Sequence, residues 1–233
     1  ACFAPVDNLD EFLDQTEAQI FKITHGQTNT QVIQSVGELG HADFVRMEAL
    51  YHSGTEAHGL HTGFYDLDRM TVGLHHGELT VLASRPGMGK TSLSLNIAWN
   101  VASRLKEPVV FFSLEMSKEQ IIRRIISSAG RINGENLKRC RLSPDEWAKR
   151  ANIQADLNET PFYIDNKPAL PILELRSKCR RIKSKYGLGL VVVDYLQLMR
   201  EPAKTRSRDE GVSYNVYGLK ELAEELGVPI IAC

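Results

Sequence analysis

The sequence predicts an α/β fold of three layers, in which helices cover both faces of a mostly parallel sheet and a helical arm precedes the sheet. Short apolar runs alternate with amphipathic helical patterns from residue 77 onward. Fully apolar strands separated by helices are typical of parallel sheets that are buried on both faces. A separate amphipathic pattern over residues 8–24 lies ahead of this alternation and predicts the arm.

The strands and helices of the main body follow from these patterns in order. The predicted strands cover residues 79–83, 109–114, 162–164, 190–193 and 229–232. The predicted helices cover residues 91–106, 118–129, 171–186 and 210–226, with further helix between the second and third strands. Capping signals at Ser117 and Ser143 indicate two helix starts, and Gly187 and Gly227 indicate two helix ends.

Residues 1–58 are predicted to form the arm, and residues 59–233 are predicted to form the second domain. In the arm, the amphipathic helix over 8–24 is followed by a polar linker over 27–40 and a second short helix over 44–50. Helices of this length are unstable alone. We therefore expect both to dock on something larger, such as a neighbouring subunit.

Composition sets limits on the classes of function. The chain has 233 residues and a formal net charge of −1, so any contact with DNA must come from a local basic patch or from an assembly. The four cysteines lie far apart without a C-x-x-C pair, which favours reduced thiols. No apolar run approaches the roughly 18 residues of a membrane span, and no signal-peptide pattern is visible. We expect a cytoplasmic protein without membrane contact.

A phosphate-binding loop follows the first predicted strand and opens the next helix. The motif G-x-x-x-x-G-K-[ST] supplies backbone N–H groups around phosphates, a lysine for the β- and γ-phosphates and a hydroxyl for Mg²⁺. The chain matches every fixed position except the first, where Ser84 replaces glycine. The predicted nucleotide-binding residues are Ser84, Arg85, Pro86, Gly87, Met88, Gly89, Lys90 and Thr91.

Two carboxylates follow other predicted strands. Asp194 ends the strand over 190–193, and Glu115 follows the strand over 109–114. Ligands of open α/β sheets bind beyond the carboxyl ends of the strands, so both acids are expected beside the loop. Asp194 is placed to orient Mg²⁺, and Glu115 is placed to orient or deprotonate an attacking water. The alternatives are an ordinary strand-end cap for Asp194 and a surface carboxylate for Glu115.

Two basic segments and the histidines leave alternatives open. The predicted helix 171–186 indicates either a face that contacts phosphates or a solvated helix surface, and the loop 204–208 indicates either a contact with DNA or a subunit, or a flexible linker. Two histidine pairs, His58/His61 and His75/His76, lack an accompanying cluster of carboxylates or cysteines, so no metal site is predicted there. The basic residues of the helix are Arg176, Lys178, Arg180, Arg181, Lys183 and Lys185.

Four segments together resemble the replicative DNA helicases of the DnaB family. These are TGFYDLDRM at 62–70, RPGMGKT at 85–91, SLEMS at 113–117 and DYLQLM at 194–199. Residues 9–23 are similar to that family's interdomain linker helix, and residues 60–232 are similar to the first part of its RecA-like motor domain. In that family the position of Ser84 is commonly a small residue other than glycine, so the resemblance accounts for the mismatch.

The resemblance implies an ATP-dependent helicase subunit that forms a ring hexamer. Such a ring hydrolyses ATP at subunit interfaces, unwinds in the 5′ to 3′ direction along single-stranded DNA, and meets a primase and a helicase loader. The resemblance also implies that Lys90 and Glu115 act in catalysis, that the loop binds ATP, and that Thr91 and Asp194 bind Mg²⁺.

The family continues past the strand 229–232 with a sensor, DNA-binding loops and an arginine finger. We therefore expect a C-terminally incomplete domain whose last strand lies at or near the sheet edge with unpaired groups. Two alternatives stay open: another RecA-like ring ATPase, such as a recombinase or a clock-type ring protein, or a chain that binds nucleotide and subunits without helicase activity.

Overall fold

The computed structural model describes residues 12, 16, 19, 35–53, 59–85, 87–200 and 207–233. The chain divides into two compact units, residues 1–59 and residues 60–233. Apart from three positions, the predicted helix over 8–24 lies outside the described residues, and so does most of the loop 204–208.

The first unit contains the helix α2 (Val36–Ser53). The prediction of a linker up to residue 40 and a short helix after it is wrong, because the helix begins earlier. Ser35 and Glu38 explain the early start: the Ser35 N–H donates to Glu38 Oε2 at 3.0 Å, and the Glu38 N–H donates to Ser35 Oγ at 3.2 Å. This reciprocal pair satisfies two amides at the helix N-terminus. The Ser35 backbone bond is also the main reason why the pKa of Glu38 lies below its ordinary value.

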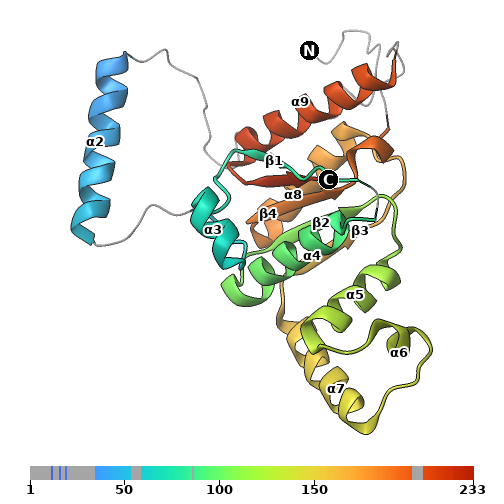
Figure 1. Ribbon diagram of the computed structural model, residues 1–233. Helices are drawn as coiled ribbons and strands as arrows, with labels where there is room; N and C mark the ends of the chain where they lie inside the picture. Colours follow the sequence, from blue (N-terminus) through green and yellow to red (C-terminus); the bar gives the residue numbers. More distant parts are fainter. Residues whose placement is uncertain are drawn as a thin grey trace. The chain divides into compact units, whose positions relative to one another are not determined.

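The second unit is built on a sheet of five strands, all paired in parallel (Figure 1). The strand order is β1-β5-β4-β2-β3. The bounds are β1 (Leu79–Val81), β2 (Val109–Ser113), β3 (Phe162–Asp165), β4 (Leu190–Asp194) and β5 (Ile230–Ala232). All five predicted strands are present, each within two residues of its predicted ends.

The last strand is not an unpaired edge, contrary to expectation. β5 pairs with β1 on one side and with β4 on the other, and its residues are fully buried. β1 is the strand at that edge of the described sheet, and its Val81 is 54% exposed.

The described helices of the second unit match the predicted ones, with two additions, α3 and a short 3₁₀ turn. Ser117 and Ser143 form the predicted capping boxes, and Gly227 ends its helix in the left-handed conformation. The bounds are α3 (Tyr65–Thr71), α4 (Lys90–Asn100) with a π-helical continuation (Val101–Leu105), α5 (Lys118–Gly130), α6 (Gly134–Lys138), α7 (Pro144–Glu159), α8 (Ile172–Tyr186), a 3₁₀ turn (Leu196–Leu198) and α9 (Arg208–Leu226).

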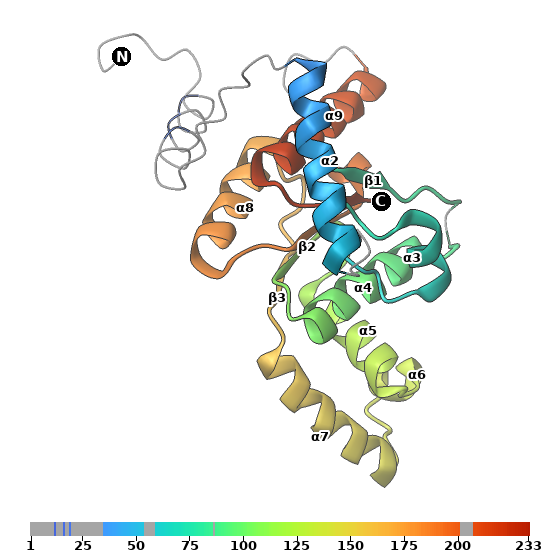
Figure 2. The same cartoon turned by 90° about the vertical axis from the view of Figure 1, so that its left-hand side faces the viewer.

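Helices cover both faces of the sheet, which confirms the three-layer α/β prediction (Figures 1 and 2). On one face, α4 and α5 pack on alternate strand residues in a single buried cluster that includes Phe111, Val192 and Ile231. On the other face lie α8 and α9, of which α9 contacts β1 and β5. The strands are therefore buried on both sides, as their uninterrupted apolar sequences require.

The short helix α3 is fixed by a carboxylate rather than by an apolar stripe. Asp68 accepts hydrogen bonds from the Thr62 backbone N–H and hydroxyl, both at 2.7 Å, and from the Gly63 N–H at 3.1 Å. The Asn100 amide then donates to the Thr62 carbonyl at 3.1 Å, which links this segment to α4.

Ion pairs join α8 to α9. Arg180 Nε donates to Glu225 Oε1 at 2.6 Å, and Arg176 contacts both Glu225 and Glu221. The Arg180 side chain is only 5% exposed. Neither sequence-based alternative for the basic helix therefore holds for Arg176 and Arg180: both side chains lie between the helices and stabilise their packing.

We predict that the fold loses stability in acid. Burial raises the pKa of Asp165, but a hydrogen bond and the charge from Lys178 outweigh it, so the net pKa is lowered. Glu225 shows the same balance, with burial opposed by Arg180. A carboxyl whose folded pKa is lowered stabilises the fold fully above its unfolded pKa, which is about 4. This contribution is lost as the pH falls through the folded pKa.

Urea unfolding between pH 7 and pH 3 checks this prediction. We expect the unfolding free energy to be flat down to about pH 5 and to fall steeply below about pH 4. Lys178→Met should reduce the acid dependence, because it removes the partner that lowers the pKa of Asp165. An unfolding free energy that stays constant down to pH 3 would contradict the prediction.

Candidate nucleotide-binding site

Four strand ends meet at one edge of the sheet. Hydrogen bonds step across this edge: Leu82 N donates to Ala232 O at 2.8 Å, Cys233 N to Val193 O at 2.9 Å, and Leu114 N to Asp194 O at 2.8 Å. The loops that follow β1, β4 and β2 are therefore neighbours, although they are far apart in the sequence. This is the edge at which open α/β sheets bind ligands.

The loop after β1 has the backbone of a phosphate cradle. Gly87 and Gly89 have φ of 79° and 91°, in the left-handed region that favours glycine. Apart from the chain neighbours, no atom of the described residues lies within 4 Å of the place that a Cβ would take on either glycine, so conformation rather than space requires glycine there. α4 begins directly at Lys90 with Gly89 as its N-cap. The helix N-terminus, with its unpaired N–H groups, therefore faces the region where phosphates would bind.

A cavity of about 600 Å³ lies beside this loop and collects most of the predicted site residues. Ser84 does not line it; its hydroxyl donates to the Arg85 carbonyl at 3.3 Å. Pro86 lies outside the described residues. The predicted residues that line the cavity are Arg85, Gly87, Met88, Gly89, Lys90, Thr91, Glu115 and Asp194.

The cavity has more cationic than anionic side chains, which favours binding of a polyanion. Four cationic side chains line it, from Arg85, Lys90, Arg124 and Arg208, against the two carboxylates of Glu115 and Asp194. A triphosphate brings several negative charges, which the excess of cations and the α4 N-terminus would offset.

Asp194 is 1% exposed, and no nitrogen or oxygen of the described residues donates a hydrogen bond to its carboxylate, whose neighbour is the protonated thiol of Cys233. A buried carboxylate without partners is unfavourable unless a cation or a donor satisfies it. Thr91, which lines the same cavity, offers a hydroxyl oxygen. Mg²⁺ takes oxygen ligands, often one or two protein groups with phosphate and water completing the shell. The pair therefore fits Mg²⁺, although no group of three or more His, Cys, Asp or Glu among the described residues could hold a metal alone.

The structure adds cavity residues that were not among the predicted site residues. Tyr195 and Gln197 line the cavity, and the Lys90 ammonium lies 5.8 Å from the centre of the Tyr195 ring. Arg124 reaches the cavity from α5, and its Nη1 donates to Ser92 Oγ at 3.2 Å. No spacing signal could have found Arg124, because its side chain meets α4 only through the packing of the two helices. Arg208 had been placed only in the basic loop 204–208.

The thiol of Cys233 lies beside this cavity and is not reactive. Burial raises its pKa to about 11, a hydrogen bond with Ser94 acts against this, and both the charge of Asp194 and a hydrogen bond with its carboxylate act in the same direction as burial. The group is therefore protonated at neutral pH, which excludes it as a nucleophile there. Cys140, Cys179 and Cys233 are all free thiols.

No described helix is long and apolar enough to cross a membrane.

Comparison with known proteins identifies the family. A model of the family described as the DnaB-like helicase C-terminal domain matches residues 59–233. The chain belongs to this family. The resemblance to DnaB found in the sequence is thereby confirmed.

Two relatives of this DnaB-like chain illustrate its extent. It is 37% identical over 227 residues to the replicative DNA helicase DnaB of Geobacillus stearothermophilus, covering 97% of this chain and 50% of the relative. It is 40% identical over 228 residues to a probable replicative DNA helicase of Trieres chinensis, with the same two coverages. The DnaB-like chain thus spans about half the length of the curated relatives it matches.

Solved structures share the fold of this DnaB-like chain. The ATPase domain of G40P superposes with a TM-score of 0.78 at 32% identity, covering 86% of this chain and 71% of that one. A DnaB-like replicative helicase, described with its interactions with primase, gives a TM-score of 0.76 at 28% identity, covering 96% of this chain and 58% of that one. The predicted RecA-like fold is confirmed.

Proposed function

We propose that this chain is the motor part of a replicative DNA helicase, which couples ATP hydrolysis to 5′ to 3′ movement along single-stranded DNA. The observation that carries the proposal is the meeting of a glycine loop, four cations and a buried unpaired Asp194 at one edge of a RecA-like sheet. The family and the named relatives support the same function.

In the proposed mechanism, the protein positions the triphosphate and offsets its charge. The amides of the loop and the Lys90 ammonium hold the phosphates, and Thr91 and Asp194 hold Mg²⁺, which supplies further charge neutralisation when bound. Glu115, exposed at the rim of the cavity, orients the attacking water or accepts its proton.

We propose that the working form is a ring of six identical subunits in which a neighbour supplies an arginine to the bound ATP. The structure of a similar helicase concerns interactions with primase, which supports a primase as a partner of the whole protein. A helicase loader and a cytoplasmic location complete this proposal.

Hydrolysis and unwinding assays test the proposed function. ATP turnover is measured with and without single-stranded DNA, strand separation is measured on a forked duplex, and mass photometry with ATP and Mg²⁺ gives the assembly state. Turnover stimulated by DNA, together with unwinding and six subunits, is expected. Turnover without unwinding would favour another RecA-like ring ATPase. Nucleotide binding without turnover would favour a binding module.

Asp194→Asn tests the Mg²⁺ assignment. The change removes the charge but keeps the size, so we expect the gain in ADP affinity that Mg²⁺ provides to fall by at least about tenfold, the loss typical of disturbed metal sites. In the absence of Mg²⁺, the same variant should melt at a higher temperature, because a buried unpaired charge is gone. Fluorescent ADP titration and calorimetry measure both effects.

Asp156→Asn, an exposed change on α7, is the matched control and should leave both quantities unchanged. An Asp194→Asn variant that keeps the full Mg²⁺ effect would remove Asp194 from the metal site.

A further inference from the structure

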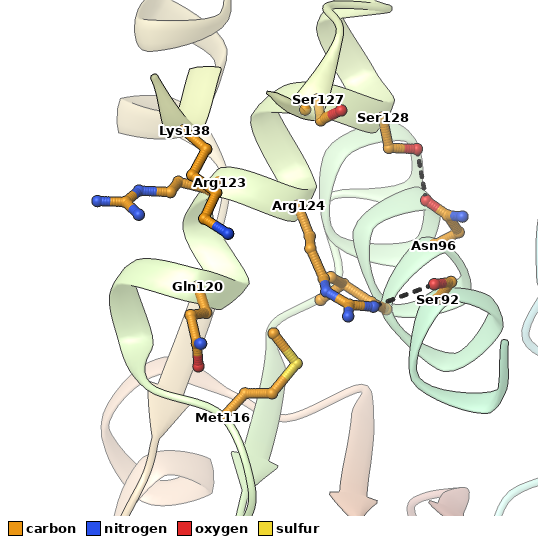
Figure 3. Close-up of a pocket in the computed structure, with 11 residues that line it drawn as sticks. Ser92, Asn96, Met116, Gln120, Arg123, Arg124, Ser127, Ser128 and Lys138 are labelled. Atoms are coloured by element: carbon orange, nitrogen blue, oxygen red, sulfur yellow. Dashed lines mark hydrogen bonds between the residues drawn. The ribbon is translucent and has the colours of Figure 1, made fainter. Parts of the chain in front are cut away.

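A second cavity, of about 550 Å³, lies between α4, α5 and α6 (Figure 3). We call it the α5 pocket. Its lining is hydroxyl- and amide-rich, with apolar surface from Leu95 and Met116. Pockets of this volume suit small molecules rather than folded partners.

The charge of the α5 pocket is positive. Arg123, Arg124 and Lys138 line it, and its described lining residues include no carboxylate. Glu119, next to the pocket on α5, interacts with the charge of Arg123 and offsets part of it. The pocket therefore offers several donors and a net positive charge, the combination that binds phosphate groups.

The α5 pocket shares a wall with the nucleotide cavity. Ser92 and Arg124 line both cavities, and the hydrogen bond between them, from Arg124 Nη1 to Ser92 Oγ, is 3.2 Å long. Figure 3 shows Arg124 turned toward α4, with Arg123 and Lys138 on the side of α5 away from α4. Ser92 directly follows Thr91, so a change at Arg124 reaches the phosphate-binding loop within one residue.

We propose that the α5 pocket binds a small phosphate-bearing molecule, distinct from the nucleotide on the loop, and that its occupancy weakens nucleotide binding. An anion in the pocket attracts Arg124 away from Ser92 and adds negative charge close to the nucleotide phosphates. Both effects lower the affinity of the nucleotide cavity, and by linkage bound nucleotide lowers the affinity of the pocket equally. This coupling, unlike the binding itself, rests on the proposed nucleotide site.

Methionine methyl NMR separates the two cavities. The chain has five methionines; Met116 lines the α5 pocket and Met88 lines the nucleotide cavity. With the nucleotide cavity saturated by Mg²⁺ and ADP, inorganic pyrophosphate is added at constant free Mg²⁺. We expect a saturable shift of the Met116 methyl signal, while Met88 keeps its ADP-bound position.

Charge reversal tests the pocket residues. Arg123→Glu and Lys138→Glu, both at exposed positions, should abolish the Met116 response, and Lys149→Glu on α7, also exposed, should retain it. Circular dichroism checks that each variant is folded. If a charge-reversal variant does not fold, Lys138→Gln is used in its place. An absent or non-saturable Met116 response overturns the proposal. So does a response to a thymidine oligonucleotide alone, which would make the pocket a nucleic-acid surface.

The coupling has its own readout. Saturating pyrophosphate should raise the Kd of a fluorescent ADP about five- to tenfold, and Lys138→Glu should remove this increase. An increase that persists in Lys138→Glu is direct competition on the loop and overturns the coupling. If Met88 fails to respond to Mg²⁺ and ADP, the proposed nucleotide site fails, while the Met116 titration still tests the pocket.

Discussion

Replacing Lys90 with alanine is expected to lower ATP hydrolysis by at least about 100-fold without unfolding the domain, a loss comparable with that of one preorganised charge-stabilising donor. Lys90 is the first residue of α4, and its ammonium lies in the nucleotide cavity over the Tyr195 ring. We expect its positive charge to stabilise the phosphates more strongly in the transition state, when the γ-phosphate is being transferred, than in the bound ATP. The apolar core does not include it, so its removal leaves packing intact.

Turnover in the presence of single-stranded DNA, fluorescent ADP affinity and the melting temperature measure this effect. Lys149→Ala, an exposed lysine outside the cavity, is the matched control and should behave as wild type in all three. Hydrolysis at the wild-type rate by Lys90→Ala would contradict the nucleotide-site assignment. A large fall in melting temperature would show that the loss is one of folding.

Replacing Arg180 with methionine is expected to lower the unfolding free energy by about 3–5 kcal/mol, the usual effect of breaking a buried pair from one side. Arg180 contributes two of the bonds that Glu225 accepts, at 2.6 and 3.0 Å, and both side chains are largely buried. Without Arg180, the Glu225 carboxylate stays buried with Arg176 as its remaining partner.

Urea unfolding at pH 7 measures the effect, with Arg181→Met as the control. Arg181 neighbours Arg180 on the same helix but is exposed, so its replacement should change stability by less than about 0.5 kcal/mol. The double variant Arg180→Met with Glu225→Met should recover most of the loss, because the buried carboxylate is removed together with its main partner and Arg176 keeps its contact with Glu221. Equal stabilities for the two single variants would refute the structural role of the pair.

The alternation of strands and helices was predictable because each element is determined by residues close together in the sequence. Each strand is a short apolar run, and each helix carries its own caps, as at Ser117 and Ser143. The start of α2 was also local, since Ser35 and Glu38 form a capping box that the sequence displays. α3 was different: Asp68 fixes it through bonds to residues five and six positions earlier, which no periodic pattern reveals.

The candidate site divides in the same way. The loop residues, Glu115 and Asp194 follow strands, and a parallel sheet brings strand ends together without further information. Arg124 comes from the side of a helix, where the rotation set by packing decides which residues reach the cavity. The Arg180–Glu225 pair is separated by 45 residues, and its partners are matched only by the docking of α8 on α9.

The strand order also has a consequence for synthesis. β1, which leads into the phosphate-binding loop, pairs within the described sheet only with β5, and Leu79 lies opposite Ile230. A ribosome adding about 5–20 residues per second therefore needs roughly 8–30 s between making the first strand and making its partner. During that interval β1, which leads into the loop, lacks its strand partner. A nucleotide that binds only the finished site would thus mark chains in which β5 has been made and has paired with β1, because the site needs this pairing as well as the loop itself.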